Sequence, residues 1–351
     1  MGATNTEPDE HRPAVRAAVE LVAAGAVLPA PLAEAAMDEL MDGTAPATQV
    51  AALLAMLRVH GETPEELAAF ARVMRARAVR VAAPVGAVDL CGTGADGAGT
   101  FNISTVAAFV VAGAGVAVAK HGNRAITSRC GSADVIEALG IPLDPGPEAV
   151  AQRIGEIGFG FIFAPSYHPA MKHAMPIRRE LPIRTAFNLL GPISSPAGVR
   201  RQLLGVAEER LLPLMAGALA RLDTDRALVV HSGDGLDELS LAGPNQAMLV
   251  DGRMVGEVEI DPAGLGLRRA PRSAFAGGDA QLNSAIAISV LGGEPGAARD
   301  VVILNAGAAL FVAGRATDVA EGVALAVDSI DSGAAAEVVD ASVRHVDAVP
   351  A

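Results

Sequence analysis

Apolar residues recur at spacings of three and four in the first part of the chain, a pattern that predicts amphipathic helices. Three stretches of this kind, each ending on a glycine, span residues 14–25, 31–43 and 47–61. Glycine is a common stop signal at the C-terminal end of a helix. Thr63 precedes Pro64 and Glu66, which is typical of a capped start of the next helix. We therefore predict an all-helical region over residues 14–80.

Beyond residue 86 the pattern changes, and short apolar runs alternate with amphipathic stretches. The runs that predict strands span residues 88–91, 116–120, 160–163, 202–206 and 226–231. The stretches that predict helices span residues 104–113, 132–139, 147–157, 208–222 and parts of 279–331. Asp251-Gly252 is a hairpin signal between apolar runs at 246–250 and 254–260. The fold class is therefore α/β, with a small all-helical N-terminal domain and a larger α/β domain around a mainly parallel central sheet.

Composition narrows the class of protein. Hydrophobic residues make up 51% of the 351 residues and charged residues 19%, which excludes a disordered chain. The net charge of −13 argues against a nucleic-acid partner, because phosphate-backbone binding needs a basic face. The longest apolar run, residues 105–119, is shorter than the roughly 20 residues of a membrane span.

From the N-terminal segment and the cysteines we expect a cytoplasmic protein. The N-terminal segment MGATNTEPDEHRP has no basic region followed by an apolar core, so we expect no signal peptide. Cys91 and Cys130 are too few for a disulfide framework, and we interpret both as small buried side chains rather than nucleophiles.

A glycine loop carries the main chemical signal. Gly92, Gly94, Gly97 and Gly99 follow a predicted buried strand within eight residues. The loop then enters a helix through side chains that can donate hydrogen bonds: Thr100, Asn102, Ser104 and Thr105. Glycines let backbone N–H groups approach an anion, and the helix start adds unpaired donors. The stretch predicts a binding site for phosphate or pyrophosphate. The simpler interpretation is an ordinary glycine-rich turn with capping residues.

The same loop matches G-x-G-x-x-G over residues 92–97, the dinucleotide fingerprint. That fingerprint opens directly into a helix and is followed about 20 residues later by an acidic residue for the ribose. Here the helix starts several residues late and the next predicted strand ends in Lys120-His121, so nicotinamide binding is disfavoured.

A second polar loop, residues 121–132, follows that next strand. Loops at the carboxyl ends of neighbouring parallel strands share one crevice, in which ligands of open α/β sheets bind. Lys120 and Arg124 would offset the charge of an anionic ligand there. Residues 120–201 carry ten basic and six acidic side chains, so this part of an acidic chain is mildly basic.

These motifs together resemble the anthranilate phosphoribosyltransferase family. Its GTGGD, N-x-S-T, KHGNR and GSAD-x-x-EALG segments correspond to residues 92–96, 102–105, 120–124 and 131–140. Further matches are HPAMK, RREL, FNLLGP and GLDELS at residues 168–172, 178–181, 187–192 and 235–240. The likeness covers nearly the whole chain. One departure is Ala95, where the family loop has a second adjacent glycine.

The resemblance implies transfer of a phosphoribosyl group from 5-phosphoribosyl pyrophosphate (PRPP) to the amine of anthranilate, with release of pyrophosphate, in tryptophan biosynthesis. The residues implied for PRPP are Gly92, Gly94, Ala95, Asp96, Thr100, Asn102, Ile103, Ser104, Thr105, Lys120, His121, Gly122, Asn123, Arg124, Ser128 and Ser132. Those implied for anthranilate are Gly92, Asn123 and Arg178, with His121 orienting. Those implied for Mg²⁺, two ions per subunit, are Ser104, Asp237 and Glu238.

The residue types fit this chemistry independently. Adjacent carboxylates suit magnesium, which keeps several waters and binds substrate phosphates. An arginine suits a planar carboxylate through a bidentate pair. The amine nucleophile is already neutral, so we assign no catalytic base.

The resemblance also implies a homodimer formed through the helical domain. We expect a domain of residues 1–85, joined by helices around 168–195, and a second domain of residues 86–351. Two alternatives stay open: a pyrimidine nucleoside phosphorylase-like enzyme, and a non-enzymatic paralogue that binds nucleic acid. The KHGNR and GLDE segments speak against the first, and the charge of −13 against the second.

Overall fold

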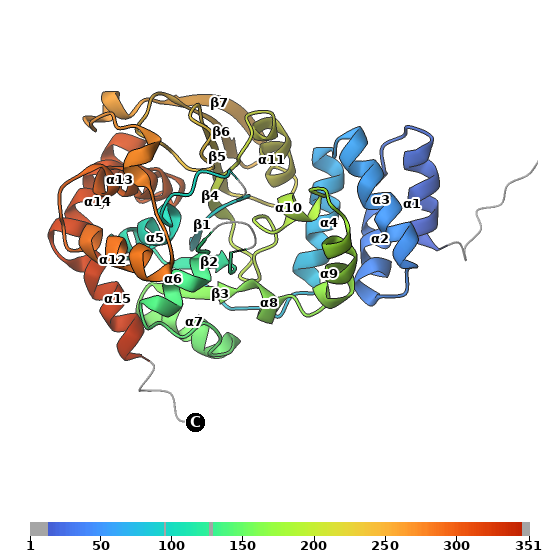
Figure 1. Ribbon diagram of the computed structural model, residues 1–351, viewed down its shortest axis with the longest axis horizontal. Helices are drawn as coiled ribbons and strands as arrows, with labels where there is room; N and C mark the ends of the chain where they lie inside the picture. Colours follow the sequence, from blue (N-terminus) through green and yellow to red (C-terminus); the bar gives the residue numbers. More distant parts are fainter. Residues whose placement is uncertain (1–12, 95, 126–128, 346–351) are drawn as a thin grey trace, which may run out of the picture.

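The computed structural model describes residues 13–94, 96–125 and 129–345. Four helices open the chain: α1 (Ala14–Ala23), α2 (Ala30–Asp42), α3 (Ala47–His60) and α4 (Pro64–Ala76). Gly43 ends α2 in the left-handed conformation at φ +72°, as the glycine signals predict. Thr63 caps α4 in a reciprocal box with Glu66. The predicted helical region is thus confirmed (Figure 1).

A seven-stranded sheet forms the centre of the α/β domain. Its strands are β1 (Val88–Gly92), β2 (Val118–Gly122), β3 (Phe159–Phe163), β4 (Arg201–Gly205), β5 (Arg226–Ser232), β6 (Asn245–Asp251) and β7 (Met254–Ile260). The order across the sheet is β3-β2-β1-β4-β5-β6-β7. The first five strands are parallel, and β6 and β7 are antiparallel. Gly252, at φ +59°, and Arg253 form the turn of the β6–β7 hairpin, one residue later than the Asp251-Gly252 signal, because Asp251 still pairs with Met254. The mainly parallel sheet and its hairpin are confirmed.

The remaining helices surround this sheet. They are α5 (Ile103–Gly113), α6 (Ser132–Ala138), α7 (Pro147–Glu156), α8 (Ala164–Tyr167), α9 (Met171–Glu180), α10 (Phe187–Leu190), α11 (Leu211–Leu219), α12 (Ala280–Leu291), α13 (Ala297–Val312), α14 (Val319–Asp331) and α15 (Ala334–Arg344). Two short 3₁₀ turns, η1 (Pro262–Leu265) and η2 (Arg272–Phe275), precede α12.

Alternate residues of the strands face two different cores. Leu203 and Leu228 belong to the core that α5, α12, α13 and α14 share with the sheet. Leu204 and Val229, one position further on, belong to the core that contains α11, α10 and the four N-terminal helices. This two-residue period is that of a sheet covered on both faces. Figure 1 shows α9 and α10 beside α4, so these helices of the 168–195 segment pack on the helical domain.

Some predicted boundaries are wrong by a few residues. The strand expected at 116–120 runs from Val118 to Gly122, because the amide of Val116 still bonds the carbonyl of Val111 and closes α5. The helix expected over 208–222 is the shorter α11. Helices α9 and α10 lie within the helices expected around 168–195, whereas α8 and α15 have no counterpart among the predicted elements. In the described part of the chain, no helix combines the length and the apolar character that crossing a membrane requires.

The topology fixes where a ligand can bind. The chain proceeds from β1 to β2 and β3 on one side, and β4 and β5 lie on the other side of β1. Such a switch point leaves a crevice at the carboxyl ends of the strands, between connections that leave in opposite directions. The glycine loop follows β1 and therefore lies at this crevice.

Candidate functional site

A cavity of about 410 Å³ opens at the carboxyl ends of β1 and β2. Predicted site residues from four separate segments line it: Gly92, Gly94, Asp96, Thr100, Asn102, Ser104, Thr105, Lys120, His121, Gly122, Asn123, Arg124, Ser132, Asp237 and Glu238. The glycine loop, the start of α5, the second polar loop and the Asp237-Glu238 pair are thus brought together.

The glycine loop needs its glycines for two different reasons. Gly94, Gly97 and Gly99 have φ values of +66°, +65° and +64°, a region that residues with a Cβ rarely adopt. Gly92 lacks this strain, but a Cβ there would lie 2.3 Å from Oδ2 of Asp237. A side chain at residue 92 would therefore displace a carboxylate from the cavity.

Asp237 and Glu238 bring negative charge into the cavity. The backbone N–H of Gly94 donates to Oδ2 of Asp237 at 2.6 Å, and that of Ser104 donates to Oε1 of Glu238 at 3.1 Å. Burial, together with nearby Asp96, raises the pKa of Asp237 to about 7. Burial, together with Asp237, raises the pKa of Glu238 to about 8, although Lys120 opposes this shift. The carboxylates are thus close to one another and short of positive charge.

These two carboxylates could hold a divalent cation only if other oxygen atoms, such as those of water and substrate phosphates, complete its coordination. In residues 13–94, 96–125 and 129–345, no three His, Cys, Asp or Glu side chains are grouped so that they could hold a metal ion. Magnesium is compatible with such a site, because it is bound by one or two carboxylates plus water and substrate phosphate oxygens. The raised pKa values of Asp237 and Glu238 agree with a cation site. Repulsion between carboxylates causes part of the rise, and a bound cation would relieve that repulsion.

Lys120 projects from β2 into the same place, with only 2% of its surface exposed. Its Nζ donates to the carbonyl of Leu90 and lies 3.4 Å from Oγ of Ser104. In the first turn of α5, the hydroxyl of Thr105 is buried without a hydrogen-bond partner among the described residues. A buried ammonium beside a helix start is suited to an anion.

The second loop is held in shape from α6. Arg124 forms ion pairs of 2.9 Å with both Asp134 and Glu137, so its charge is already balanced. The hydroxyl of Ser132 donates to the carbonyl of Asn123 at 3.2 Å. Asn123 uses its own Oδ1 to accept the amide of Arg124 at 2.7 Å, which leaves its side-chain NH₂ for a ligand.

His121 is a neutral side chain in this site. Burial, with His168 5.3 Å away between ring centroids, lowers the pKa of His121 to about 3. Its Nε2 is buried and has no partner among the described residues. A neutral imidazole can orient a ligand by one hydrogen bond, in line with the orienting role expected of it.

Two predicted residues do not line the cavity. The side chain of Ile103 is buried in the core, so only its backbone can reach a ligand. Arg178 lies on α9 with its guanidinium 5.1 Å from the centre of the Phe187 ring, and burial lowers its pKa. The predicted positions Ala95 and Ser128 lie outside the described residues.

The cavity also contains residues that we did not predict as site residues. Arg184 reaches it from the segment between α9 and α10, and Asn188 reaches it from α10. Nη2 of Arg184 lies 3.5 Å from the carbonyl of Gly94. Thr93 accepts the amide of Ala207 on its hydroxyl at 3.3 Å. Asn188 belongs to the FNLLGP motif and Arg184 shortly precedes it, and this motif is the sequence signal that could have identified them.

Neither Cys91 nor Cys130, both within the described residues, is part of a disulfide, and both line the cavity. Burial raises the pKa of the Cys130 thiol to about 11 and also raises that of Cys91. Both thiols are therefore protonated at neutral pH, as expected of small packing residues rather than nucleophiles. Cys130 is buried, but Cys91 is only partly buried, so the expectation of burial is wrong for Cys91.

Comparison with known proteins places these features in a family. The α/β domain of a glycosyl transferase family matches residues 85–336, and the helical bundle domain of that family matches residues 16–78. The anthranilate phosphoribosyltransferase of Rubrobacter xylanophilus is 53% identical, over 94% of this chain and 97% of its own length. That of Azorhizobium caulinodans is 51% identical, over 93% and 95%.

Solved structures agree with these sequences. The anthranilate phosphoribosyltransferase of Thermus thermophilus superposes with a TM-score of 0.90 at 45% identity, covering 96% of this chain and all of the other. That of Saccharomyces cerevisiae, solved in complex with PRPP and Mg, gives a TM-score of 0.87 at 27% identity, over 95% and 98%.

Proposed function

The chain belongs to the anthranilate phosphoribosyltransferase family, and we propose that it transfers the 5-phosphoribosyl group of PRPP to the amine of anthranilate and releases pyrophosphate, in tryptophan biosynthesis. One observation supports this reaction above the others. A glycine loop and a helix start, both rich in anion donors, share a cavity with Lys120 and an adjacent carboxylate pair. A pyrophosphate leaving group needs this combination of donors and metal-binding oxygens.

PRPP would lie along the glycine loop and the start of α5. The backbone N–H groups of the loop and the hydroxyls of Thr100, Ser104 and Thr105 would donate to the phosphate oxygens, and Lys120 would offset their charge. The N–H groups of Gly94 and Ser104 already donate to carboxylates, so these donors face the cavity. Asn102, Ser132 and the remaining residues of the second loop would enclose the ribose phosphate.

Magnesium is the metal that we propose for this chain, because a structure of the yeast relative is a complex with PRPP and Mg. When bound, it would neutralise charge that develops on the departing pyrophosphate. Ser104, Asp237 and Glu238 would hold it, in two sites per subunit, with Asp96 close to Asp237. These residues fit a hard cation because their oxygens converge and their carboxylate charge is uncompensated.

Anthranilate would bind next to the second loop. The side-chain NH₂ of Asn123 and the backbone at Gly92 would contact it, while neutral His121 orients it. Arg178 would pair with its carboxylate, which requires the guanidinium to turn from the Phe187 ring toward the substrate. The amine of anthranilate is a neutral nucleophile, so we assign no general base to this chain.

The proposal extends to the oligomeric state and to the division of the chain into domains. We propose a homodimer formed through the helical domain, and a division between residues 1–85 and 86–351 in which the helices of 168–195 accompany the first. The packing of α9 and α10 on the bundle supports that last point.

Anthranilate fluorescence tests the reaction directly. Mixing the protein with anthranilate, PRPP and Mg²⁺ should abolish the fluorescence of free anthranilate, and omission of Mg²⁺ should prevent the loss. Unchanged fluorescence at saturating PRPP and Mg²⁺ would contradict the substrate assignment. Thymidine with phosphate serves as the control, because release of free base would instead indicate the phosphorylase-like alternative.

A further inference from the structure

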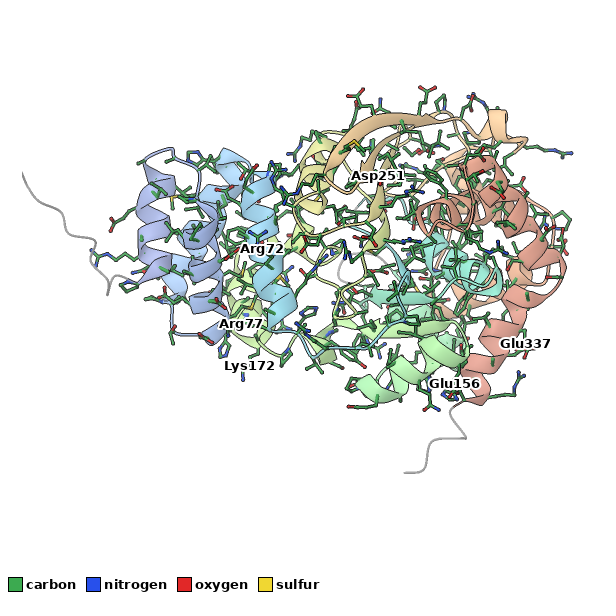
Figure 2. All side chains as sticks on the ribbon, turned by 180° about the vertical axis from the view of Figure 1, so that it is seen from behind. Arg72, Arg77, Glu156, Lys172, Asp251 and Glu337 are labelled. Atoms are coloured by element: carbon green, nitrogen blue, oxygen red, sulfur yellow. The ribbon has the colours of Figure 1, made fainter. Side chains whose placement is uncertain are left out.

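A second, larger cavity lies away from the glycine loop. Its volume is about 710 Å³, and it shares no lining residue with the cavity of the proposed reaction. Four segments form it: the C-terminal half of α4, residues 80–83, residues 195–198, and residues 221–223 after α11. It therefore lies where the helical domain meets the α/β domain, and Figure 2 shows Arg72 of α4 at this junction.

The lining of this cavity is basic in an acidic protein. It contains four arginines, Arg72, Arg75, Arg80 and Arg221, and a single aspartate, Asp223. The charges of Arg72 and Arg221 are balanced by ion pairs with Glu34 and Glu65, which do not line the cavity. Neither Arg75 nor Arg80 forms an ion pair with any carboxylate in the described part of the chain. Two cations are therefore left for a ligand, with only Asp223 against them.

Arg75 is held in place for such a ligand. Its Nε donates to the carbonyl of Ile193 at 2.8 Å and its Nη1 to that of Leu222 at 3.3 Å, one from each side of the junction. Carbonyls orient the guanidinium without neutralising it. Burial lowers the pKa of Arg75 to about 10, which leaves it charged at neutral pH. Ser195 lines the same cavity, and its hydroxyl is buried without a partner among the described residues.

We propose that this cavity is a binding site for a small phosphorylated molecule, whose phosphate group lies between Arg75 and Arg80. The planar fork of an arginine matches phosphate oxygens, and the buried hydroxyl of Ser195 is a further donor. The volume is within the range of sites for small organic ligands and exceeds what a lone phosphate ion fills. This site is separate from the substrates of the proposed transferase, so it does not depend on that reaction.

Isothermal titration calorimetry on the whole protein tests the site with three probes: adenosine 5′-monophosphate, adenosine and inorganic phosphate. Arg80→Gln removes an exposed cation, and Ala82→Glu adds a negative charge to an exposed lining position. Each should weaken binding of the monophosphate about tenfold or more, because a charged hydrogen bond contributes roughly 1.5–3 kcal/mol. Arg253→Gln, an exposed arginine on the β6–β7 turn, is the matched control and should bind as the wild type does.

The probes and the variants give distinct outcomes. Binding of the monophosphate but not of adenosine, lost in both cavity variants, supports the site and assigns a phosphate ester. Equal binding of inorganic phosphate would show a site for the free ion and would overturn the assignment to a phosphorylated molecule. Binding that is the same in all variants belongs to the glycine-loop cavity and overturns the proposal. Absence of binding by the wild type, or equal binding of adenosine, overturns it as well.

Discussion

Gly92 shows how one missing side chain determines the site. It ends β1, and a Cβ on it would meet the Asp237 carboxylate at 2.3 Å and the Asp237 carbonyl at 3.2 Å. We expect Gly92→Ala to lower kcat/KM for PRPP about 100-fold, because a carboxylate shifted by about 1 Å no longer fits its ligand. The overpacking should also lower the free energy of unfolding by about 1–3 kcal/mol.

Steady-state kinetics and urea unfolding measure these two effects. Gly155→Ala is the control, because Gly155 lies in α7 with no heavy atom within 4 Å of the added Cβ. That substitution should raise stability by up to about 1 kcal/mol through helix propensity, with kcat/KM unchanged. A Gly92→Ala enzyme as active as the wild type would contradict the contact with Asp237.

Asp237 makes stability depend on pH in a definite direction. Its pKa rises from an ordinary 3.8 to about 7 on folding, so the folded protein holds this proton more tightly than the unfolded chain. Without Mg²⁺, stability should therefore fall as pH rises from about 4 to 7. Asp237→Asn removes this penalty and should be more stable than the wild type at pH 8 by about 2 kcal/mol.

Thermal unfolding without Mg²⁺ at pH 4 and pH 8 measures this difference. Near pH 4 the folded wild-type carboxyl is protonated and neutral, so the two proteins should melt at similar temperatures. Activity with Mg²⁺ should fall in the variant, which separates the two roles of the carboxylate. A gain in stability of the same size at both pH values would show that ionisation is not its cause.

At the level of residues, the sequence identifies groups that can bind a ligand, but not the side chains that hold these groups in place. The glycine loop is identified from local order, because a loop of this kind has its chemistry in consecutive positions, whereas the Asp237-Glu238 pair is implied only by the resemblance to the family. The ion pairs of Arg124 with Asp134 and Glu137 were not foreseen, since they depend on how α6 packs behind the loop. Arg184 was missed for the same reason, because a separate segment brings it to Gly94.

At the level of elements, the start of α4 offers a direct test. The hydroxyl of Thr63 accepts the amide of Glu66 at 3.2 Å, and the Glu66 carboxylate accepts the amides of Thr63 and Leu28, each at 2.8 Å. Thr63→Ala removes one half of this box and should lower the free energy of unfolding by about 1 kcal/mol. Urea unfolding checks it.

Thr48→Ala is the matched control for this cap. Thr48 is exposed in the first turn of α3 and forms no side-chain cap. Its substitution should change stability by less than about 0.5 kcal/mol. Equal losses in the two variants would show that the loss at Thr63 is not due to the capping box.

The elements also show why some boundaries escape the sequence. The run that ends α5 and begins β2 is apolar throughout, so hydrophobicity alone cannot separate the two, and a backbone bond from Val116 to Val111 decides the boundary. Helix α9 continues through Pro176, a residue that argues against a helix interior, so only the approximate range 168–195 and not the bounds of this helix could be predicted. By contrast, the Asp251-Gly252 signal predicts the hairpin to within one residue, and the strand–helix alternation predicts a mainly parallel sheet but not the order of its strands.

At the level of the whole molecule, two domains contribute to one cavity. The α/β domain supplies the glycine loop, Lys120 and the carboxylates, and the stretch that follows α9 supplies Arg184 and, from α10, Asn188. The net charge of −13 therefore says little about this cavity, because Lys120 from one domain and Arg184 from the other both bring positive charge to it. Arg184 is the residue through which this joint contribution can be tested.

Arg184→Gln should raise the KM for PRPP about tenfold and change kcat less. Nη2 of Arg184 lies 3.5 Å from the carbonyl of Gly94, so its charge is next to the loop that we propose holds the pyrophosphate. Loss of a charged donor that acts equally on bound substrate and transition state weakens binding without slowing the chemical step. Arg179→Gln, an exposed arginine at the end of α9 that lines neither cavity, should leave both constants unchanged. A fall in kcat at constant KM would instead mean that Arg184 acts on the transition state alone, and a matching effect of Arg179→Gln would mean that net charge rather than position is responsible.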